Sequence, residues 1–295
     1  MNCLDLTIGD NYALYNGDCV DVLRGLPAQS IDYSIFSPPF SSLYTYSNSP
    51  RDMGNCRDDD EFFAQFGFML AELRRVMKPG HNVSFHCMLL PAGKERDGYI
   101  GLKDFRGDLI RAFQAHGFIH ASEVVIWKDP VTAMQRTKAL GLLHKTVREN
   151  ACMSRQGIPD YLVTMRAPGE MVDRVKHDPA DYPVSKWQQM ASPIWTDIDP
   201  NDTLQYRSAR EHNDERHICP LQLEVIRRGI DLWTNPGDVV LSPFAGIGSE
   251  GYVALQMQRR FVGIELKRSY YEQAVRNLQN AHKESGDLFA VAEVA

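Results

Sequence analysis

Two short motifs in this chain combine residue types that could do chemistry. The first is the tetrapeptide Ser-Pro-Pro-Phe at residues 37–40, and the second is Ser-Pro-Phe-Ala-Gly-Ile-Gly-Ser at residues 242–249. Each follows an apolar run that is typical of a buried strand. The first could form a rigid polar and aromatic clamp for a flat substrate that carries an amine. The second could form a glycine turn that lets a cofactor approach the backbone.

The tetrapeptide has the groups that would hold an exocyclic amine. Pro38 and Pro39 restrict the backbone to an extended form and remove two N–H donors, so the carbonyls of Ser37 and Pro38 can face outward as acceptors. Hydrogen bonds accepted from both N–H groups of an amine favour a tetrahedral nitrogen with a free lone pair. Phe40 offers a face for a stacked base, as flipped bases require. The alternative is a proline loop that ends a core strand and buries Phe40.

The second motif continues as a helix and then as a strand that ends in an acid, which is the order of a nucleotide-binding βαβ unit. Gly246 and Gly248 leave room for a ligand, and Glu265 could accept both hydroxyls of a ribose. The helix begins with Ser249 and Glu250, and a glutamate there disfavours a pyrophosphate. A ribose ligand with a positive charge fits better, and S-adenosylmethionine has both. The alternative is a tight turn without a ligand.

Composition limits the class of protein that carries these motifs. The 295 residues are 43% hydrophobic and 24% charged, as in a soluble globular protein. No apolar stretch approaches the roughly 20 residues that span a bilayer, and the start of the chain lacks a signal-peptide profile. Six scattered cysteines without a C-x-x-C pair favour reduced thiols over a disulfide framework or a metal site. We expect a cytoplasmic protein.

The elements that must position the two motifs follow from periodicity. Alternating strand-like and helix-like segments over the first 130 residues predict an α/β domain with a parallel sheet. The clearest helix is expected at residues 61–77, before Lys-Pro-Gly at 78–80. Further helices are expected at 18–26, 105–116, 221–233, 249–257 and 269–278, and further strands at 82–87, 122–127, 161–166, 238–241 and 260–265.

In this order, the motifs resemble those of the amino-methyltransferases of DNA, which methylate adenine N6 or cytosine N4 with S-adenosylmethionine. The clamp precedes the glycine turn, as in the permuted β group of that family. The resemblance covers most of residues 12–280. Its motifs are Asn16-Gly17-Asp18-Cys19, Leu26-Pro27, Ile31-Asp32, residues 37–40, residues 73–80, Trp127-Lys128, residues 217–222, residues 235–238 and residues 244–249.

The resemblance implies one methyltransferase domain over residues 1–295, with a Rossmann-like sheet, helices on both faces and a circularly permuted motif order. It implies that Ser37, Pro38, Pro39 and Phe40 hold the target base. The family usually has Asp where this chain has Ser242, so one carboxylate near the cofactor is missing. The implied cofactor-binding residues are Asp18, His217, Cys219, Pro220, Ser242, Phe244, Ala245, Gly246, Gly248, Ser249, Glu250, Glu265 and Leu266.

The resemblance also implies an in-line methyl transfer that needs no strong general base, because the methylated, cationic amine can lose its proton to water. Ser at the first clamp position is typical of cytosine-N4 enzymes, and Asp or Asn is typical of adenine-N6 enzymes. Ser37 therefore favours cytosine N4 over adenine N6. A glutamine-amide methyltransferase has the glycine turn first, which disfavours that alternative. A non-catalytic nucleic-acid-binding module is the alternative from another class.

Two inserted segments, residues 130–158 and 167–216, are expected to recognise the DNA target. The net charge of −6 disfavours a uniformly basic surface but allows a local basic patch. We expect Trp187 and Trp195 to anchor the second segment to the core. Double-stranded DNA is the expected partner, with a homodimer and a restriction nuclease on another chain as further expectations. The candidate phosphate contacts are Arg136, Lys138, His144, Lys145, Arg148 and Arg155, and a solvated charged face is the alternative.

Overall fold

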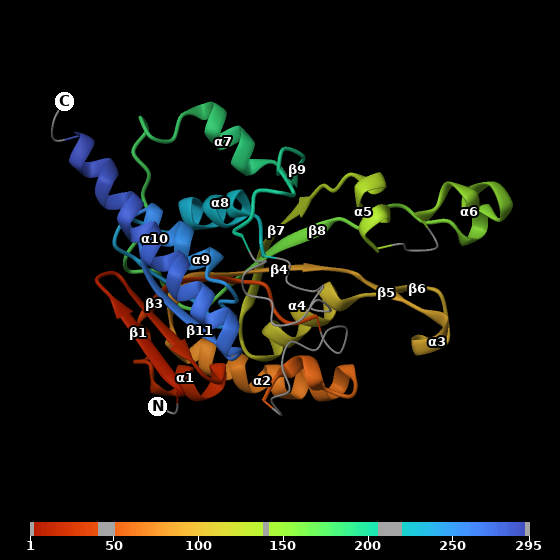
Figure 1. Ribbon diagram of the computed structural model, residues 1–295, viewed down its shortest axis with the longest axis horizontal. Helices are drawn as coiled ribbons and strands as arrows, with labels where there is room; N and C mark the ends of the chain where they lie inside the picture. Colours follow the sequence, from red (N-terminus) through yellow and green to blue (C-terminus); the bar gives the residue numbers. More distant parts are fainter. Residues whose placement is uncertain (1–2, 41–50, 138–141, 206–219, 293–295) are drawn as a thin grey trace.

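The computed structural model describes residues 3–40, 51–137, 142–205 and 220–292. Its main feature is a nine-stranded sheet in the order β1-β2-β11-β10-β3-β4-β8-β7-β9 within these residues (Figure 1). The strands in that order are Asp5–Gly9, Tyr12–Asn16, Arg260–Glu265, Val239–Ser242, Ile31–Phe36, Met77–Met88, Asp160–Arg166, Ile119–Ile126 and Ile194–Trp195.

The centre of the sheet is parallel, as the alternating sequence pattern predicts. Strands β2, β11, β10, β3 and β4 pair in parallel, whereas β8 pairs antiparallel with both β4 and β7. Strand β3 is buried along its whole length, which explains its continuous apolar run. The β1–β2 hairpin was not predicted, and β4 begins at Met77 rather than at residue 82.

Helices cover both faces of the sheet (Figure 1). On one face, α1 (Cys19–Gly25), α2 (Asp59–Val76) and α4 (Phe105–Ala115) enclose an aromatic core that includes Phe62, Phe66 and Phe113. On the other face, α8 (Leu223–Trp233), α9 (Ser249–Gln256) and α10 (Arg268–Ala292) enclose a second core. The α/β fold class is confirmed.

The connections of the central strands diverge between β10 and β3. The connection from β3 through α2 reaches β4, and the connection from β10 through α9 reaches β11 on the other side. Strands β3 and β10 are neighbours, with Tyr33 opposite Val240. A crevice opens beyond the carboxyl ends of strands at such a switch point, and ligands of open α/β sheets bind there. Residues 37–40 and 243–250 follow these two strand ends.

Two projections extend from the sheet on the same side (Figure 1). The first follows β4 and consists of the hairpin of β5 (Leu90–Ala92) and β6 (Gly101–Lys103) with α3 (Lys94–Asp97) between them. The second joins β7 to β8 and contains α5 (Pro130–Thr137), α6 (His144–Glu149) and the 3-10 helix η4 (Ala151–Met153). Another 3-10 helix, η2 (Met53–Asn55), precedes α2. The helices of the second projection lie within residues 130–158.

The predicted segment at residues 167–216 contains α7 (Val184–Ala191) and β9 within its described part. Trp195 anchors this segment as predicted, because its side chain is only 1% exposed and lies under the guanidinium of Arg228 at 4.9 Å. Arg228 also binds Asp197 through Nη2 and Oδ2 at 2.6 Å. The prediction for Trp187 is wrong: this side chain is 56% exposed, because α7 buries none of its residues.

Candidate functional site

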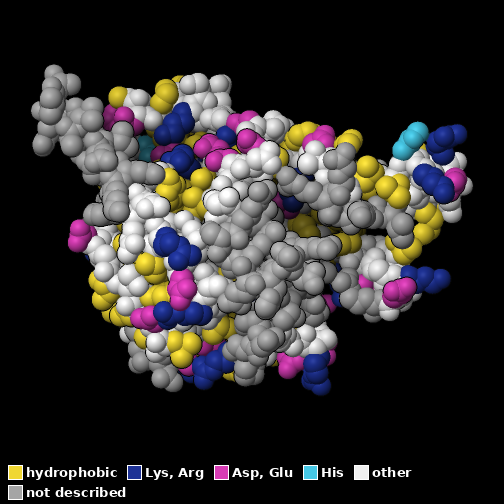
Figure 2. Space-filling model, in the orientation of Figure 1, with side chains coloured by type: hydrophobic (Ala, Val, Ile, Leu, Met, Phe, Trp, Pro, Cys, Tyr) yellow, Lys and Arg dark blue, Asp and Glu magenta, His cyan; other side chains and the backbone are white. Residues whose placement is uncertain are grey.

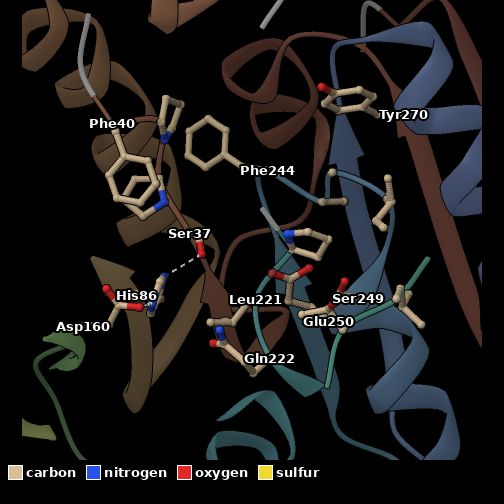
Figure 3. Close-up of a pocket in the computed structure, with 18 of the residues that line it drawn as sticks. Ser37, Phe40, His86, Asp160, Leu221, Gln222, Phe244, Ser249, Glu250 and Tyr270 are labelled. Carbon is tan, nitrogen blue, oxygen red and sulfur yellow. Dashed lines mark hydrogen bonds and ion pairs between the residues drawn. The ribbon is translucent and has the colours of Figure 1, made fainter. Parts of the chain in front are cut away.

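A cavity of ≈ 1350 Å³ lies beyond the carboxyl ends of the parallel strands (Figure 3). Its wall includes the residues after β2, β3, β10 and β11, together with the ends of β4 and β7. Pockets for one small ligand are typically about 300–1,000 Å³. The cavity therefore has room for two ligands at once, such as a cofactor and a flat substrate.

The four clamp residues all line this cavity. Ser37, Pro38, Pro39 and Phe40 follow directly from the buried strand β3. Phe40 is half-buried and packs against Phe105, with ring centroids 6.3 Å apart. The Phe40 ring therefore contacts the core and also forms part of the cavity wall. The ring can therefore offer a stacking surface whose position is set by the core.

A polar network that sequence reasoning missed ends at Ser37. Its Oγ lies 3.2 Å from Nδ1 of His86, which comes from β4. Nε2 of His86 lies 3.0 Å from Oδ2 of Asp160, the first residue of β8, in an ion-pair contact that does not have the geometry of a hydrogen bond. Nζ of Lys128 lies 2.5 Å from the same oxygen. Strand pairing brings these residues together. Ser37 and Lys128 belong to motifs that are recognisable in the sequence, whereas His86 and Asp160 do not.

The carboxylate of Asp160 is held in its charged form by this network. Asp160 is only 2% exposed, and burial by itself would raise its pKa. Interactions with His86 and with the charged Lys128 outweigh burial and lower this pKa below its usual value. Both Asp160 and His86 line the cavity. The network thus holds an ionised carboxylate, paired with Lys128, behind the clamp.

The glycine turn and the acid of β11 meet in space. The backbone N–H of Gly246 donates to Oε2 of Glu265 at 2.8 Å, and the backbone N–H of Lys267 donates to Oε1 at 2.8 Å. Burial raises the pKa of Glu265 to about 7. Gly246 has φ +53°, and a Cβ there would meet no atom within 4 Å. The turn therefore leaves open space where a ligand could approach its backbone.

Glu250 places a second acid in the same wall. Glu250 is only 5% exposed, and burial raises the pKa of its carboxyl to about 8. The negative charge of Glu265 contributes in the same direction. Two buried acids at the glycine turn suit a ligand with hydroxyl donors and a positive charge. A phosphate would be repelled by both when they are ionised.

Most of the other residues predicted to bind a cofactor also line the cavity. Asp18 does so while it caps α1, since its Oδ1 accepts from the N–H groups of Val20 and Asp21 at 3.0 and 3.1 Å. His217 and Cys219 lie outside the described residues. The remaining members of the predicted set in the wall are Pro220, Phe244, Ala245, Ser249 and Leu266.

Ser242 and Gly248 support the turn from behind and do not line the cavity. Ser242 is fully buried, and its hydroxyl has no hydrogen-bond partner among the described residues. Gly248 has φ +84° at the start of α9, and a Cβ there would lie 3.1 Å from Cβ of Ala274 on α10. Its lack of a side chain lets the turn pack closely against α10.

Among the predicted basic residues whose side chains are described, His144, Lys145, Arg148 and Arg155 do not line the cavity. His144, Lys145 and Arg148 are exposed on α6, and Figure 2 shows basic side chains gathered at the end of that projection. Arg155 is only partly exposed and donates to the carbonyl of Gln156 at 3.0 Å. Arg136 belongs to α5, and Lys138 lies outside the described residues. The wall holds other cations, namely Arg51, Lys128 and Lys267.

The described residues contain neither a cluster of metal ligands nor a helix suited to a membrane. No group of three His, Cys, Asp or Glu side chains in that part of the chain could hold a metal ion. Within the same residues, no helix combines the length and apolar character that crossing a membrane requires.

Comparison with known proteins gives a family for this site and fold. The model of a family described as DNA methylase matches residues 31–276. The DNA adenine methyltransferase YhdJ of Escherichia coli (strain K12) is 23% identical over 287 residues, which cover 94% of this chain and 86% of YhdJ. The residues that the family model matches include the clamp and the glycine turn.

Solved structures share the fold. The putative DNA modification methylase TTHA0409 of Thermus thermophilus, complexed with S-adenosyl-L-methionine, superposes with a TM-score of 0.67 and 20% identity. That likeness covers 92% of this chain and 96% of the other. The PvuII DNA methyltransferase, described as cytosine-N4-specific, superposes with a TM-score of 0.66 and 16% identity over 96% of each chain.

Proposed function

The chain belongs to the DNA methylase family, and we propose that it transfers a methyl group from S-adenosylmethionine to N4 of a cytosine in DNA. The observation that carries this proposal is one cavity with the clamp on one side and the glycine turn on the other. The two motifs follow the neighbouring strands β3 and β10. A flipped base at the clamp would therefore meet a cofactor at the turn.

The residues at the turn fit S-adenosylmethionine. Glu265 keeps lone pairs free beside those that accept from Gly246 and Lys267, so it can accept ribose hydroxyls. Gly246 has open space on the cavity side. Glu250 is a buried acid that lines the cavity and can face a cation. It can supply a carboxylate near the turn in place of the Asp that the family usually has at position 242. Among the described residues, this carboxylate has no cationic partner of its own.

Ser37 supports cytosine over adenine. Its hydroxyl and the carbonyl of Pro38 can accept from the two N–H groups of an exocyclic amine, and Phe40 can stack on the ring. Positioning and these hydrogen bonds would supply the catalysis. Ser at this position resembles cytosine-N4 enzymes. Adenine N6 is the second candidate, because both bases offer the same donor pair and the relative YhdJ is an adenine methyltransferase.

The arrangement along the chain supports the permuted β group. The clamp strand β3 comes early and the glycine-turn strand β10 comes late, yet the two strands pair. We propose that residues 130–158 and 167–216 contact double-stranded DNA, with the exposed His144, Lys145 and Arg148 binding phosphates. A second copy of the chain and a separate restriction nuclease are proposed as further partners, and the cytoplasm is the proposed compartment.

Identification of the modified nucleoside tests the proposed function. DNA of mixed sequence would be incubated with the protein and S-adenosylmethionine, digested to nucleosides and analysed by mass spectrometry. We expect N4-methylcytosine, and its loss in a Ser37→Ala variant that still binds the cofactor. Methyladenine alone would overturn the choice of base. No methylated nucleoside, together with no calorimetric binding of the cofactor, would favour a non-catalytic module.

A further inference from the structure

The surroundings of His86 determine which of its ring nitrogens carries a proton. Nε2 faces the ionised carboxylate of Asp160 at 3.0 Å, so Nε2 carries the hydrogen. In the neutral ring, Nδ1 is then an acceptor, and the hydroxyl of Ser37 at 3.2 Å donates to it. Both lone pairs of the Ser37 oxygen are left to accept an N–H from an amine in the cavity.

We infer that Ser37, His86 and Asp160 form a proton relay, in which Ser37 takes a proton from the target amine and passes its own proton to His86. This inference rests on the proposed function, because it assigns a path for the proton that methylation of an amine must release. It differs from the expectation drawn from the sequence that the proton goes directly to water. His86 and Asp160 act through Ser37.

The relay moves one proton away from the amine while the methyl group moves onto it. When bound, S-adenosylmethionine supplies an electrophilic methyl carbon, and its sulfur keeps the electron pair of the bond that breaks. The target nitrogen uses its lone pair to form the new bond and becomes cationic. Its N–H proton passes to Oγ of Ser37 while the Ser37 proton passes to Nδ1 of His86. Asp160 stabilises the resulting imidazolium, which then releases one proton to water in the cavity.

The charges around the ring match this role. Asp160 at the start of β8 and Lys128 after β7 are opposite charges in contact, so these two side chains cancel each other's charge. If His86 is already protonated, both ring nitrogens donate, and the Ser37 hydroxyl turns its hydrogen toward the cavity. The hydroxyl then faces the N–H donors of the amine. The relay therefore works only while His86 is neutral.

Another buried histidine on the same strand provides a matched control. His81 also lies on β4, but its Nδ1 lies 2.8 Å from the backbone oxygen of Asp32, and it does not line the large cavity. His86→Asn keeps an acceptor for Ser37 but cannot take a proton. His81→Asn removes another buried imidazole, which has no path to the clamp. Melting temperatures and calorimetric affinities for the cofactor establish that each variant is folded.

The single-turnover rate of methylation as a function of pH tests the relay. We expect the wild-type rate to fall about tenfold per pH unit below one ionisation, because a protonated His86 blocks the clamp. His86→Asn should be at least about 100-fold slower and lack that ionisation, the effect typical of a lost acid–base group. His81→Asn should keep the wild-type profile. An unchanged rate and pH profile in His86→Asn would overturn the relay.

Nitrogen NMR of the histidine rings tests the same inference without any turnover. In the cofactor-free protein, the ring signals that disappear in His86→Asn should report a hydrogen on Nε2 and none on Nδ1. Asp160→Asn should weaken that preference. A hydrogen on Nδ1 in the wild type would overturn the relay, even if the protein methylates DNA. Absence of methylation by the wild type would instead overturn the proposed function.

Discussion

The backbone N–H of Gly246 donates to the carboxylate of Glu265 at 2.8 Å, which ties the glycine turn after β10 to the acid that ends β11. The N–H of Lys267 holds the other carboxylate oxygen at the same distance. The carboxylate is thus fixed at both oxygens by main-chain donors. A ligand that binds the turn and the acid meets a preformed site.

Replacement of Glu265 by Gln should weaken binding of S-adenosylmethionine by about 10- to 100-fold, the range expected for lost hydrogen bonds to a charged group. An amide can accept from only one of the two backbone donors, and its NH₂ group faces the other. Isothermal titration calorimetry measures the change. Glu272→Gln is the control, because Glu272 is half-exposed on α10 and pairs with Arg268 at 2.8 Å. Equal affinities of Glu265→Gln and wild type would contradict this role.

Glu250 should make the unliganded protein less stable as pH rises. Burial raises the pKa of Glu250 from 4.5 to about 8, so between these values the native state holds a proton that the unfolded state has released. The free energy of unfolding therefore decreases with rising pH in this window, by on the order of 3–5 kcal/mol for this group. Glu265 contributes with the same sign up to about pH 7.

Glu250→Gln stays neutral and should flatten this dependence. Thermal melting from pH 5 to pH 8 is the measurement, and we expect the wild type to lose about 5–10 °C more than the variant. S-adenosylmethionine, as a cation beside the ionised acid, should stabilise the wild type more at pH 8 than at pH 6. Parallel melting curves for the two proteins would argue against a buried, protonated Glu250.

The two glycines of the turn should respond differently to alanine. Gly248→Ala should destabilise the fold by about 1–3 kcal/mol, because φ is +84° and the new Cβ would lie 3.1 Å from Cβ of Ala274. Gly246→Ala should lower the free energy of unfolding by about 1 kcal/mol, because alanine is strained at a positive φ. It should cause no clash, since the new Cβ enters open space. That Cβ should instead reduce cofactor affinity. Denaturant unfolding measures the stability of both variants, and calorimetry measures their cofactor affinity. A larger loss of stability in Gly246→Ala, with a larger loss of affinity in Gly248→Ala, would refute these roles.

Arg228 should be a stability residue without a role in cofactor binding. It is buried on α8, where it binds Asp197 and lies over Trp195 of β9. Arg228→Met should lower the free energy of unfolding by about 1–3 kcal/mol, because it removes the ion pairs of a buried guanidinium and a cation–π contact. Its neighbour Arg227 is 42% exposed, and Arg227→Met should cost less than about 1 kcal/mol. Cofactor affinity should change in neither variant.

Local patterns predicted the strands that carry the two motifs. The apolar run at residues 31–36 is β3, and the expected strand at 260–265 is β11 with the same bounds. Helix α2 was predicted to within two residues because Asp58 caps it and Lys-Pro-Gly follows it. The β1–β2 hairpin was missed, because its pairing depends on β2 lying against β11, far along the chain.

The residue types of the site were determined by the sequence alone: the Ser-Pro-Pro-Phe clamp, the two glycines and the acid that ends β11. Only the tertiary structure decided that Ser37 meets His86, 49 residues away, and that Asp160 stands behind that ring. It also decided that Trp187 is exposed while Trp195 is buried. The physical reason is that strand order and register depend on packing between distant segments, which periodicity within one segment does not encode.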